Sequence, residues 1–178
     1  MNTLAKFEVV KLPKLWIVGK EIRYSDDALQ QGDNRLPTFW NACYEENLFA
    51  PLEAQAEILF EDAHAGVFID WYLGDGDFSH IVGMLMKAAP AVPKGYVVRE
   101  LAETEAAWCW VKCKAIEETR AVPFDSIAKA ITDIGRSCAG MRWCVDSYHR
   151  TRSTMPDENG YVILDCLIPL DEGMERVQ

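Results

Sequence analysis

The chain begins with two apolar runs that have the pattern of β-strands. Residues 7–12 (FEVVKL) and 15–24 (LWIVGKEIRY) are rich in valine, isoleucine and aromatic side chains, which favour extended structure. Pro13 stands between them, and a proline within such a run is typical of a strand edge or a bulge. The pattern therefore predicts one interrupted strand, followed by a polar, loop-like segment.

A helix and a hairpin are predicted next. Across residues 36–48 the apolar side chains recur at the three- and four-residue spacing of one helix face, with Pro37 in the first turn and Pro51 just beyond the end. Two further apolar runs flank the sequence LGDGD, in which Asp-Gly is a strong hairpin-turn signal. We therefore expect paired strands at residues 66–73 and 78–87.

The same order of elements recurs in the second half. Residues 95–113 predict a pair of strands, and residues 125–140 predict a helix with Asp125 as its N-cap and Gly140 near its C-cap. The buried face of this helix is expected to consist of Ile127, Ala130, Ile131, Ile134 and Cys138. A last hairpin is expected over residues 143–150 and 161–170.

The last hairpin carries one aspartate in the middle of each strand, Asp146 and Asp165. A buried carboxylate without a partner either costs several kcal/mol or takes up a proton. Two interpretations remain open. In the first, both aspartates face a shared groove between the halves. In the second, they pair with arginines at a sheet edge, for which the candidates are Arg142, Arg150 and Arg152.

Each half of the chain thus reads strand, helix, strand, strand. Residues 9–20 and 97–112 have similar sequences and occupy the same place in each half. This repetition predicts an α+β fold of duplicated βαββ units related by a pseudo-two-fold axis, with halves at about residues 1–88 and 95–171 of a single domain spanning 1–178. We expect the helices on one face of the sheet, and a ligand groove between the halves on the other face.

The amino-acid composition argues against several classes of function. The chain has 178 residues, of which 49% are hydrophobic, and a formal net charge of −10 at pH 7. Binding to nucleic acid or to an anionic membrane is disfavoured, because both need clustered lysine and arginine. The three histidines (His64, His80 and His149) have no metal-ligand spacing, so neither a metal nor a cofactor is expected.

The six cysteines suggest buried, reduced thiols. They form no CxxC pair, and the closest in sequence are Cys109 and Cys113. The first residues lack the apolar core of a secretory signal, and no apolar run approaches the roughly 20 residues of a membrane helix. We therefore expect a cytoplasmic protein without disulfides.

The sequence resembles the GyrI-like effector-binding domain, the small-molecule-sensing domain of bacterial multidrug transcription regulators such as BmrR and Rob and of stand-alone gyrase-inhibitor relatives. The matching pieces stand in the family's order and extend over about residues 5–171: FEVVKLPKLWIVG, LPTFW, GVFIDW, DGDFSHIVGM, VPKGYVVRELAETEAAW, CVDSY and LDCLIPL. The resemblance implies the duplicated fold with its cleft at the pseudo-two-fold axis. A DNA-binding domain is not expected within this length.

The resemblance also implies ligand-binding residues. In the family an acid two residues before a tyrosine often meets cationic ligands, and here these are Asp146 and Tyr148. A second acid in the last strand corresponds to Asp165, and the family's acids are usually glutamates. Trp108 and Trp110 share one face of a strand, because side chains alternate along it. The expected aromatic walls are Trp40, Trp71, Trp108 and Trp110.

Three functions follow as hypotheses. The first is a stand-alone binding module for hydrophobic, cationic aromatic small molecules. The second is an enzyme, since some relatives hydrolyse reactive cyclopropane-containing compounds, with Asp146 and Tyr148 as the catalytic pair. The third is a protein-binding role, as in the gyrase-inhibiting relatives, with a regulator or a gyrase-type protein as partner.

Overall fold

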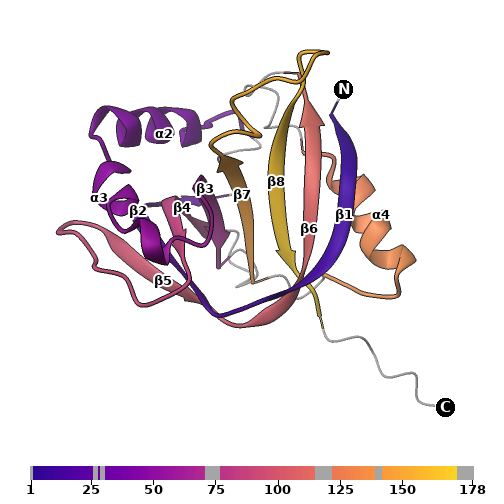
Figure 1. The fold of residues 1–178 in the computed structure, drawn as a ribbon, viewed down its shortest axis with the longest axis horizontal. Coiled ribbons are helices and arrows are strands. Elements are labelled where there is room, and N and C mark those ends of the chain that lie inside the picture. The colour runs from indigo at the N-terminus through magenta and orange to yellow at the C-terminus, as the bar shows by residue number, and fades with distance from the viewer. Residues whose placement is uncertain are drawn as a thin grey trace.

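The computed structural model describes residues 2–25, 28, 31–70, 77–114, 122–138 and 142–171. The strands in this part of the chain form one eight-stranded sheet, in which every neighbouring pair is antiparallel. Its order is β1-β6-β8-β7-β3-β4-β2-β5 (Figure 1). The strands are β1 (Thr3–Leu12), β2 (Leu15–Ser25), β3 (Ala63–Ile69), β4 (Asp77–Met86), β5 (Val97–Leu101), β6 (Thr104–Cys113), β7 (Trp143–His149) and β8 (Val162–Pro169).

The first predicted strand is two strands at distant places in the sheet. β1 pairs with β6 at one edge, whereas β2 pairs with β4 and β5 near the other edge (Figure 1). Pro13 lies at the crossing between them, where a residue without an N–H ends the ladder. Leu12 and Leu15 on either side are almost fully buried, so the crossing is anchored in the core.

The strand pairing in residues 95–113 also differs from the prediction. β5 and β6 do not pair with each other, because β5 joins β2 and β6 lies between β1 and β8. The resulting order is the one expected if two repeats had exchanged their first strands, with β7 and β3 side by side at the centre. The superposition of the two halves stays a prediction. The strand pairing of both predicted hairpins is confirmed, as β3 pairs with β4 and β7 with β8. The Asp-Gly turn of the first hairpin lies outside the described residues.

The helices lie close to the predicted ranges. The helices whose bounds fall within the described residues are α2 (Leu36–Glu45), the short α3 (Ala50–Glu53), a 3-10 turn (Ala56–Ile58) and α4 (Phe124–Asp133). Within the described residues, no helix combines the length and apolar content needed to cross a membrane.

The ends of α4 differ from the prediction. Pro123 holds the N-cap position and Asp125 lies in the first turn, without a capping hydrogen bond. The helix ends before Gly135, whose φ of 72° lies in the left-handed region that glycine tolerates. The predicted cap, Gly140, lies outside the described residues. Ile134 therefore follows the helix and is 47% exposed.

Both helical layers cover the same face of the sheet, at opposite ends (Figure 1). α4 buries Ile127 and Ile131 against a core under β6, β7 and β8 that includes Cys109, Cys144 and Cys166. α2 and α3 cover a second core over β2 and β4, whose members are Val18, Cys43, Leu48, Phe49, Leu52, Val82, Met84 and Met86. A third core lies on the opposite face and includes Ile17, Val67, Ile81, Val145 and Leu167.

Candidate functional site

Asp146 and Asp165 point to opposite faces of the sheet. In the β7–β8 ladder Asp146 stands opposite Cys166, and Ser147 stands opposite Asp165. Directly opposed residues share a face and neighbours along a strand alternate, so the two carboxylates lie on different sides. The expectation of a shared groove is therefore wrong. Cys166 belongs to the core under α4, which places Asp146 on the helix-bearing face and not on the face that we expected to form the groove.

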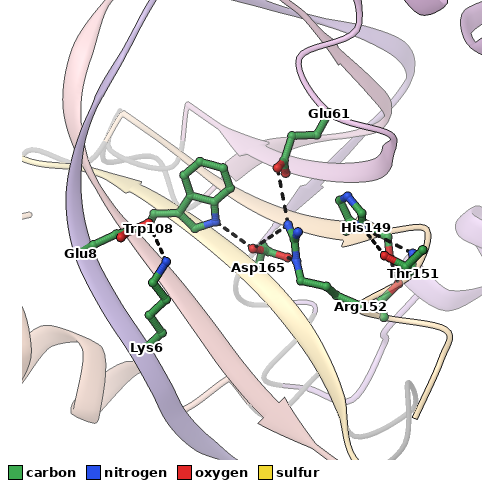
Figure 2. A network of polar contacts seen from close by, with 9 residues as sticks. Lys6, Glu8, Glu61, Trp108, His149, Thr151, Arg152 and Asp165 are labelled. Atoms are coloured by element: carbon green, nitrogen blue, oxygen red, sulfur yellow. Dashed lines mark hydrogen bonds and ion pairs between the residues drawn. The ribbon is translucent and has the colours of Figure 1, made fainter. Parts of the chain in front are cut away.

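Asp165 is the centre of a satisfied polar network, shown in Figure 2. Its carboxylate is fully buried and accepts hydrogen bonds from Arg152 Nε at 3.1 Å and Arg152 Nη2 at 3.2 Å. The indole of Trp108 donates a further bond of 2.8 Å. Arg152 also contacts Glu61 at 3.4 Å. Of the two interpretations, the ion pair with an arginine is therefore the one that describes Asp165.

Trp108 and Trp110 lie on this same face, away from Asp146. Trp108 uses its N–H on Asp165, and the Trp110 ring contacts the guanidinium of Arg152 at 5.3 Å and the ammonium of Lys6 at 4.6 Å. Both indoles are therefore engaged by groups of the protein itself. Trp71 lies outside the described residues.

Asp146 has no comparable partner. Within the described part of the chain it forms no ion pair, and its hydrogen bond comes from the Cys166 thiol, with Sγ 3.4 Å from Oδ1. It is half-buried, and burial raises its pKa to about 6, while the thiol bond lowers the pKa. At neutral pH the site therefore holds a largely ionised carboxylate that the fold does not neutralise.

Aromatic rings surround the sheet surface beside Asp146. Tyr148 lies two residues further along β7 on the same face, and Trp40 reaches over from α2. The two rings meet edge to face, with centroids 5.2 Å apart and an interplanar angle of 74°. Tyr148 packs against the core under α4 and Trp40 against the core under α2, so the site lies where these two cores meet.

Gly66, directly opposite Asp146 on β3, makes room for this arrangement. A Cβ atom at this position would lie 2.9 Å from Trp40 Cζ2 and 2.9 Å from His80 Cε1. Real Cβ atoms do not approach other atoms so closely. The absent side chain therefore lets Trp40 lie against the strand next to the carboxylate.

His80 fixes the position of Trp40, a role that the sequence analysis missed. The Trp40 indole donates to His80 Nε2 at 3.1 Å, which leaves the imidazole proton on Nδ1. His80 is 2% exposed, and burial lowers its pKa to about 4. Its Nδ1 has no hydrogen-bond partner among the described residues. The alternation of DFSHIVGM places His80 on the face of Phe78 and Val82, but nothing in that pattern marks Trp40 as its partner.

A cavity of about 260 Å³ extends from Tyr148 along the surface. Arg150 at its rim bonds Glu53 at 2.9 Å and Asp62 at 3.1 Å, and Glu53 also contacts His64 at 3.2 Å. The lining residues are Tyr44, Glu53, Asp62, Ala63, His64, Tyr148, Arg150, Ser153 and Thr154. Tyr44, His64 and Tyr148 supply aromatic surface, and two carboxylates against one arginine leave the rim with net negative charge.

The structure thus brings Asp146, Tyr148 and Trp40 together and separates them from Asp165, Trp108 and Trp110. Among the described residues, no group of three or more histidine, cysteine and acidic side chains could hold a metal ion. Tyr148 lines the cavity, whereas Asp146 and Trp40 lie beside it; we call these three residues together with the cavity the aromatic cleft.

The sequence matches no protein-family model and no curated protein. Similar solved structures exist. A candidate bacterial transcription regulation protein from Staphylococcus aureus MU50 is 17% identical, with a TM-score of 0.66, over 94% of this chain and 99% of that one. SAV2435, solved bound to tetraphenylphosphonium, is 16% identical, with a TM-score of 0.65, over 93% of this chain and 94% of that one.

A third likeness is to EcmrR in a cryo-EM structure of a DNA complex, at 10% identity and a TM-score of 0.51, over 94% of this chain and 57% of that one. Identities this low establish the fold alone. The chain has the mostly antiparallel α+β architecture of the GyrI-like effector-binding domain, which confirms the predicted fold class; the duplication of the two halves stays a prediction.

Proposed function

We propose that the chain is an effector-binding module that takes up a hydrophobic, cationic aromatic small molecule in the aromatic cleft. The observation that carries the proposal is the state of Asp146, a desolvated carboxylate without an ion pair among the described residues, beside the rings of Trp40 and Tyr148. Burial without a counter-charge is unfavourable, and a bound cation removes that unfavourable term.

The expected energies favour a cation. A unit positive charge about 4 Å from the carboxylate contributes roughly 4 kcal/mol at an effective dielectric constant of about 20, before the ligand's own desolvation is subtracted. Each aromatic face adds about 0.5–2 kcal/mol to a cation lying over it. Net affinities in the micromolar range, roughly −7 to −8 kcal/mol, are consistent with these terms.

The dimensions favour a flat or multi-ring ligand. Tyr148 is two residues from Asp146 along β7, a separation of about 7 Å in a strand. Tyr148 also lines the cavity of about 260 Å³, which is slightly below the usual range for drug-sized ligands of about 300–1,000 Å³. A ligand in this cavity would therefore place its rings against Tyr44 and Tyr148 and direct its charge along β7 toward Asp146.

The tetraphenylphosphonium complex of SAV2435 supports this ligand class, because that protein shares the fold and its ligand is a hydrophobic aromatic cation. The relation to EcmrR and to the S. aureus protein supports a link to transcription regulators. Asp165, Trp108 and Trp110 have no part in this proposal, since their polar and ring surfaces are engaged within the opposite face.

One observation favours hydrolysis as a second function. Asp146 and Tyr148 share a face, and a carboxyl group with a pKa of about 6 is suited to general-base catalysis near neutral pH. Turnover of a reactive cyclopropane-containing compound that disappears in Asp146→Asn would support the enzyme. Stoichiometric binding without product supports the binding module.

The test of the proposed function is a tryptophan-fluorescence titration with tetraphenylphosphonium. Wild type should bind with a micromolar Kd, and Asp146→Asn should bind at least about tenfold more weakly, a loss of about 1.4 kcal/mol. Asp133→Asn is the matched control, since it removes the same charge from an exposed position on α4. Equal weakening by both variants would show that net charge, and not the cleft, attracts the cation.

A further inference from the structure

Two cysteines and the site carboxylate lie in one row across the sheet. Cys109 on β6 is directly opposite Cys166 on β8, and Cys166 is directly opposite Asp146 on β7. Gly66 on β3 continues the row beyond Asp146. Because opposed residues share a face, both thiols point to the same side as the carboxylate and the aromatic cleft.

The strand register, and not closeness in the sequence, brings Cys109 and Cys166 together. Cys109 and Cys113 are close in sequence but four residues apart on one strand, which separates them by about 13 Å. Opposed residues on antiparallel strands have Cβ atoms about 4.5–5.5 Å apart. The Cys109 and Cys166 thiols are therefore close enough for one small ligand to reach together. Cys144, buried in the same core, is a third thiol near both of them.

Cys166 connects the pair to the aromatic cleft. Its thiol donates a hydrogen bond to Asp146 Oδ1 at 3.4 Å. The carboxylate is therefore positioned to accept the thiol proton when the sulfur forms a new bond. Cys109 and Cys166 are both fully buried, and burial raises the pKa of each; the Asp146 charge adds to the rise at Cys166. Reagents that attack only thiolates should therefore react slowly here.

The ligand must bring part of its own coordination shell. Among the described residues, no cluster of three ligating side chains could hold a bare metal ion. A trivalent arsenic atom that carries an organic group needs only two thiolates to complete three bonds. Soft thiolate ligands suit such a centre. The Trp40 ring and His80 already fill the space beside Gly66, so the organic group has to displace the Trp40 ring from the strand.

We propose that Cys109 and Cys166 form a dithiol site for trivalent aryl arsenicals, R–As(OH)₂, with Asp146 as the proton carrier. The aromatic cleft of the proposed function is the entrance, but the cationic ligand of that function is not required. The aryl group lies toward Trp40 and Tyr148, and the arsenic atom lies under α4 between the two strands.

The reaction is a ligand exchange without electron transfer. Each thiol loses its proton and forms an As–S bond, and each As–OH bond breaks to release one water, so arsenic remains trivalent. Asp146 takes the proton from Cys166 and passes it to the departing hydroxyl group. The carboxylate is restored at the end, which makes it a carrier for exchange and not a reactant.

The test uses phenylarsine oxide with intact-protein mass spectrometry and peptide mapping. Wild type should bind one equivalent across Cys109 and Cys166, resist an excess of a monothiol and release the arsenical to a dithiol. Cys109→Ser and Cys166→Ser should each weaken binding by at least about 100-fold, because the second bond is intramolecular. Cys43→Ser and Cys113→Ser, at buried positions outside the row, should bind as wild type does.

Asp146→Asn provides a second measurement that does not depend on the cysteine variants' folding. It should slow arsenical binding by at least about tenfold, as expected for loss of a proton carrier, and leave the final stoichiometry at one. An unchanged rate would overturn the role of Asp146. Arsenic found on half-exposed Cys138, or on any pair other than Cys109 and Cys166, would overturn the site.

The outcome is separable from that of the proposed function. Cys109→Ser should bind tetraphenylphosphonium as wild type does, because Cys109 lies one strand further from Asp146 than Cys166. If the arsenical is held by both thiols and the phosphonium does not bind, only the proposed function fails. If the phosphonium binds and the arsenical is lost to a monothiol, only the dithiol site fails.

Discussion

Asp146 and Asp165 stand on neighbouring strands, one register position out of line, and point to opposite faces of the sheet. That offset gives the two aspartates different chemistry. Asp165 meets Arg152 and Trp108 and is fully satisfied within the protein. Asp146 meets a thiol and keeps an uncompensated charge beside the aromatic cleft. One carboxylate is therefore paired within the fold, and the other is the one that we propose for ligand binding.

The stability of the empty protein should depend on Asp146 and on pH. Burial raises the folded-state pKa to about 6, above the value of about 3.9 for an exposed aspartate. The folded state thus holds this proton more tightly, so the group lowers stability progressively as pH rises from about 4 to about 6. Asp146→Asn should be more stable than wild type at pH 7 by up to about 3 kcal/mol, and equal to it near pH 4.

Urea unfolding at the two pH values measures this difference, with Asp133→Asn as the exposed control. A variant less stable than wild type at pH 7 would mean that an unseen cation already compensates Asp146 or that the carboxylate is needed for folding.

The Arg152–Asp165 pair should behave as a structural element. Arg152→Met leaves a fully buried carboxylate without its cation and should destabilise the protein by about 3–5 kcal/mol. The double variant Arg152→Met/Asp165→Asn should recover most of that loss, because the amide oxygen still accepts from Trp108 and no buried charge remains. Urea unfolding checks both, and an additive double variant would contradict the pairing.

Gly66→Ala should disturb the wall of the cleft. The new Cβ would force Trp40 and His80 to move, at a cost of about 1–3 kcal/mol, and should shift the tryptophan emission. In a Trp40→Ala background the same substitution should cost less, since one of the two close contacts is gone. Equal costs in both backgrounds would show that Trp40 does not lie against the strand in solution.

His80 should remain neutral to unusually low pH. Burial lowers its pKa to about 4, whereas a histidine in the unfolded chain titrates near 6.5. The unfolded state therefore takes up this proton first, and the stability contributed by neutral His80 is lost as pH falls from about 6.5 to about 4. A pH titration of its ring resonances by NMR measures the pKa directly, and a midpoint near 6.5 would contradict the burial of the Trp40–His80 pair.

Local patterns predicted most of the elements but not their pairing. The Asp-Gly signal and the alternating apolar runs predicted the two strand pairs β3–β4 and β7–β8. The apolar spacing predicted the helices α2 and α4. The exchange of β1 and β5 between the halves depends on contacts between distant residues, which no local pattern encodes. The end of α4 was misplaced because Gly135 adopts a positive φ and ends the helix five residues before the predicted cap.

The spatial grouping of the candidate site residues could be predicted only in part, for a related reason. Asp146, Tyr148 and Trp40 were identified from the resemblance, and the structure brings them together. The face of Asp165 depends on the register between β7 and β8, which a single-residue offset reverses. His80 and Cys166 look like ordinary strand residues in the sequence, and only the three-dimensional contacts with Trp40 and Asp146 single them out.

The central claim, that Asp146 recognises positive charge in the aromatic cleft, is tested most directly with a charge-matched ligand pair. An arylmethyl trimethylammonium ion and its tert-butyl isostere have the same shape and differ in charge. Fluorescence titration of wild type at pH 7.5, where Asp146 is ionised, should show the cation binding at least about tenfold more tightly than the neutral isostere, and Asp146→Asn should remove that preference. Equal affinity of wild type for both ligands, or a preference that survives in Asp146→Asn, would contradict the account.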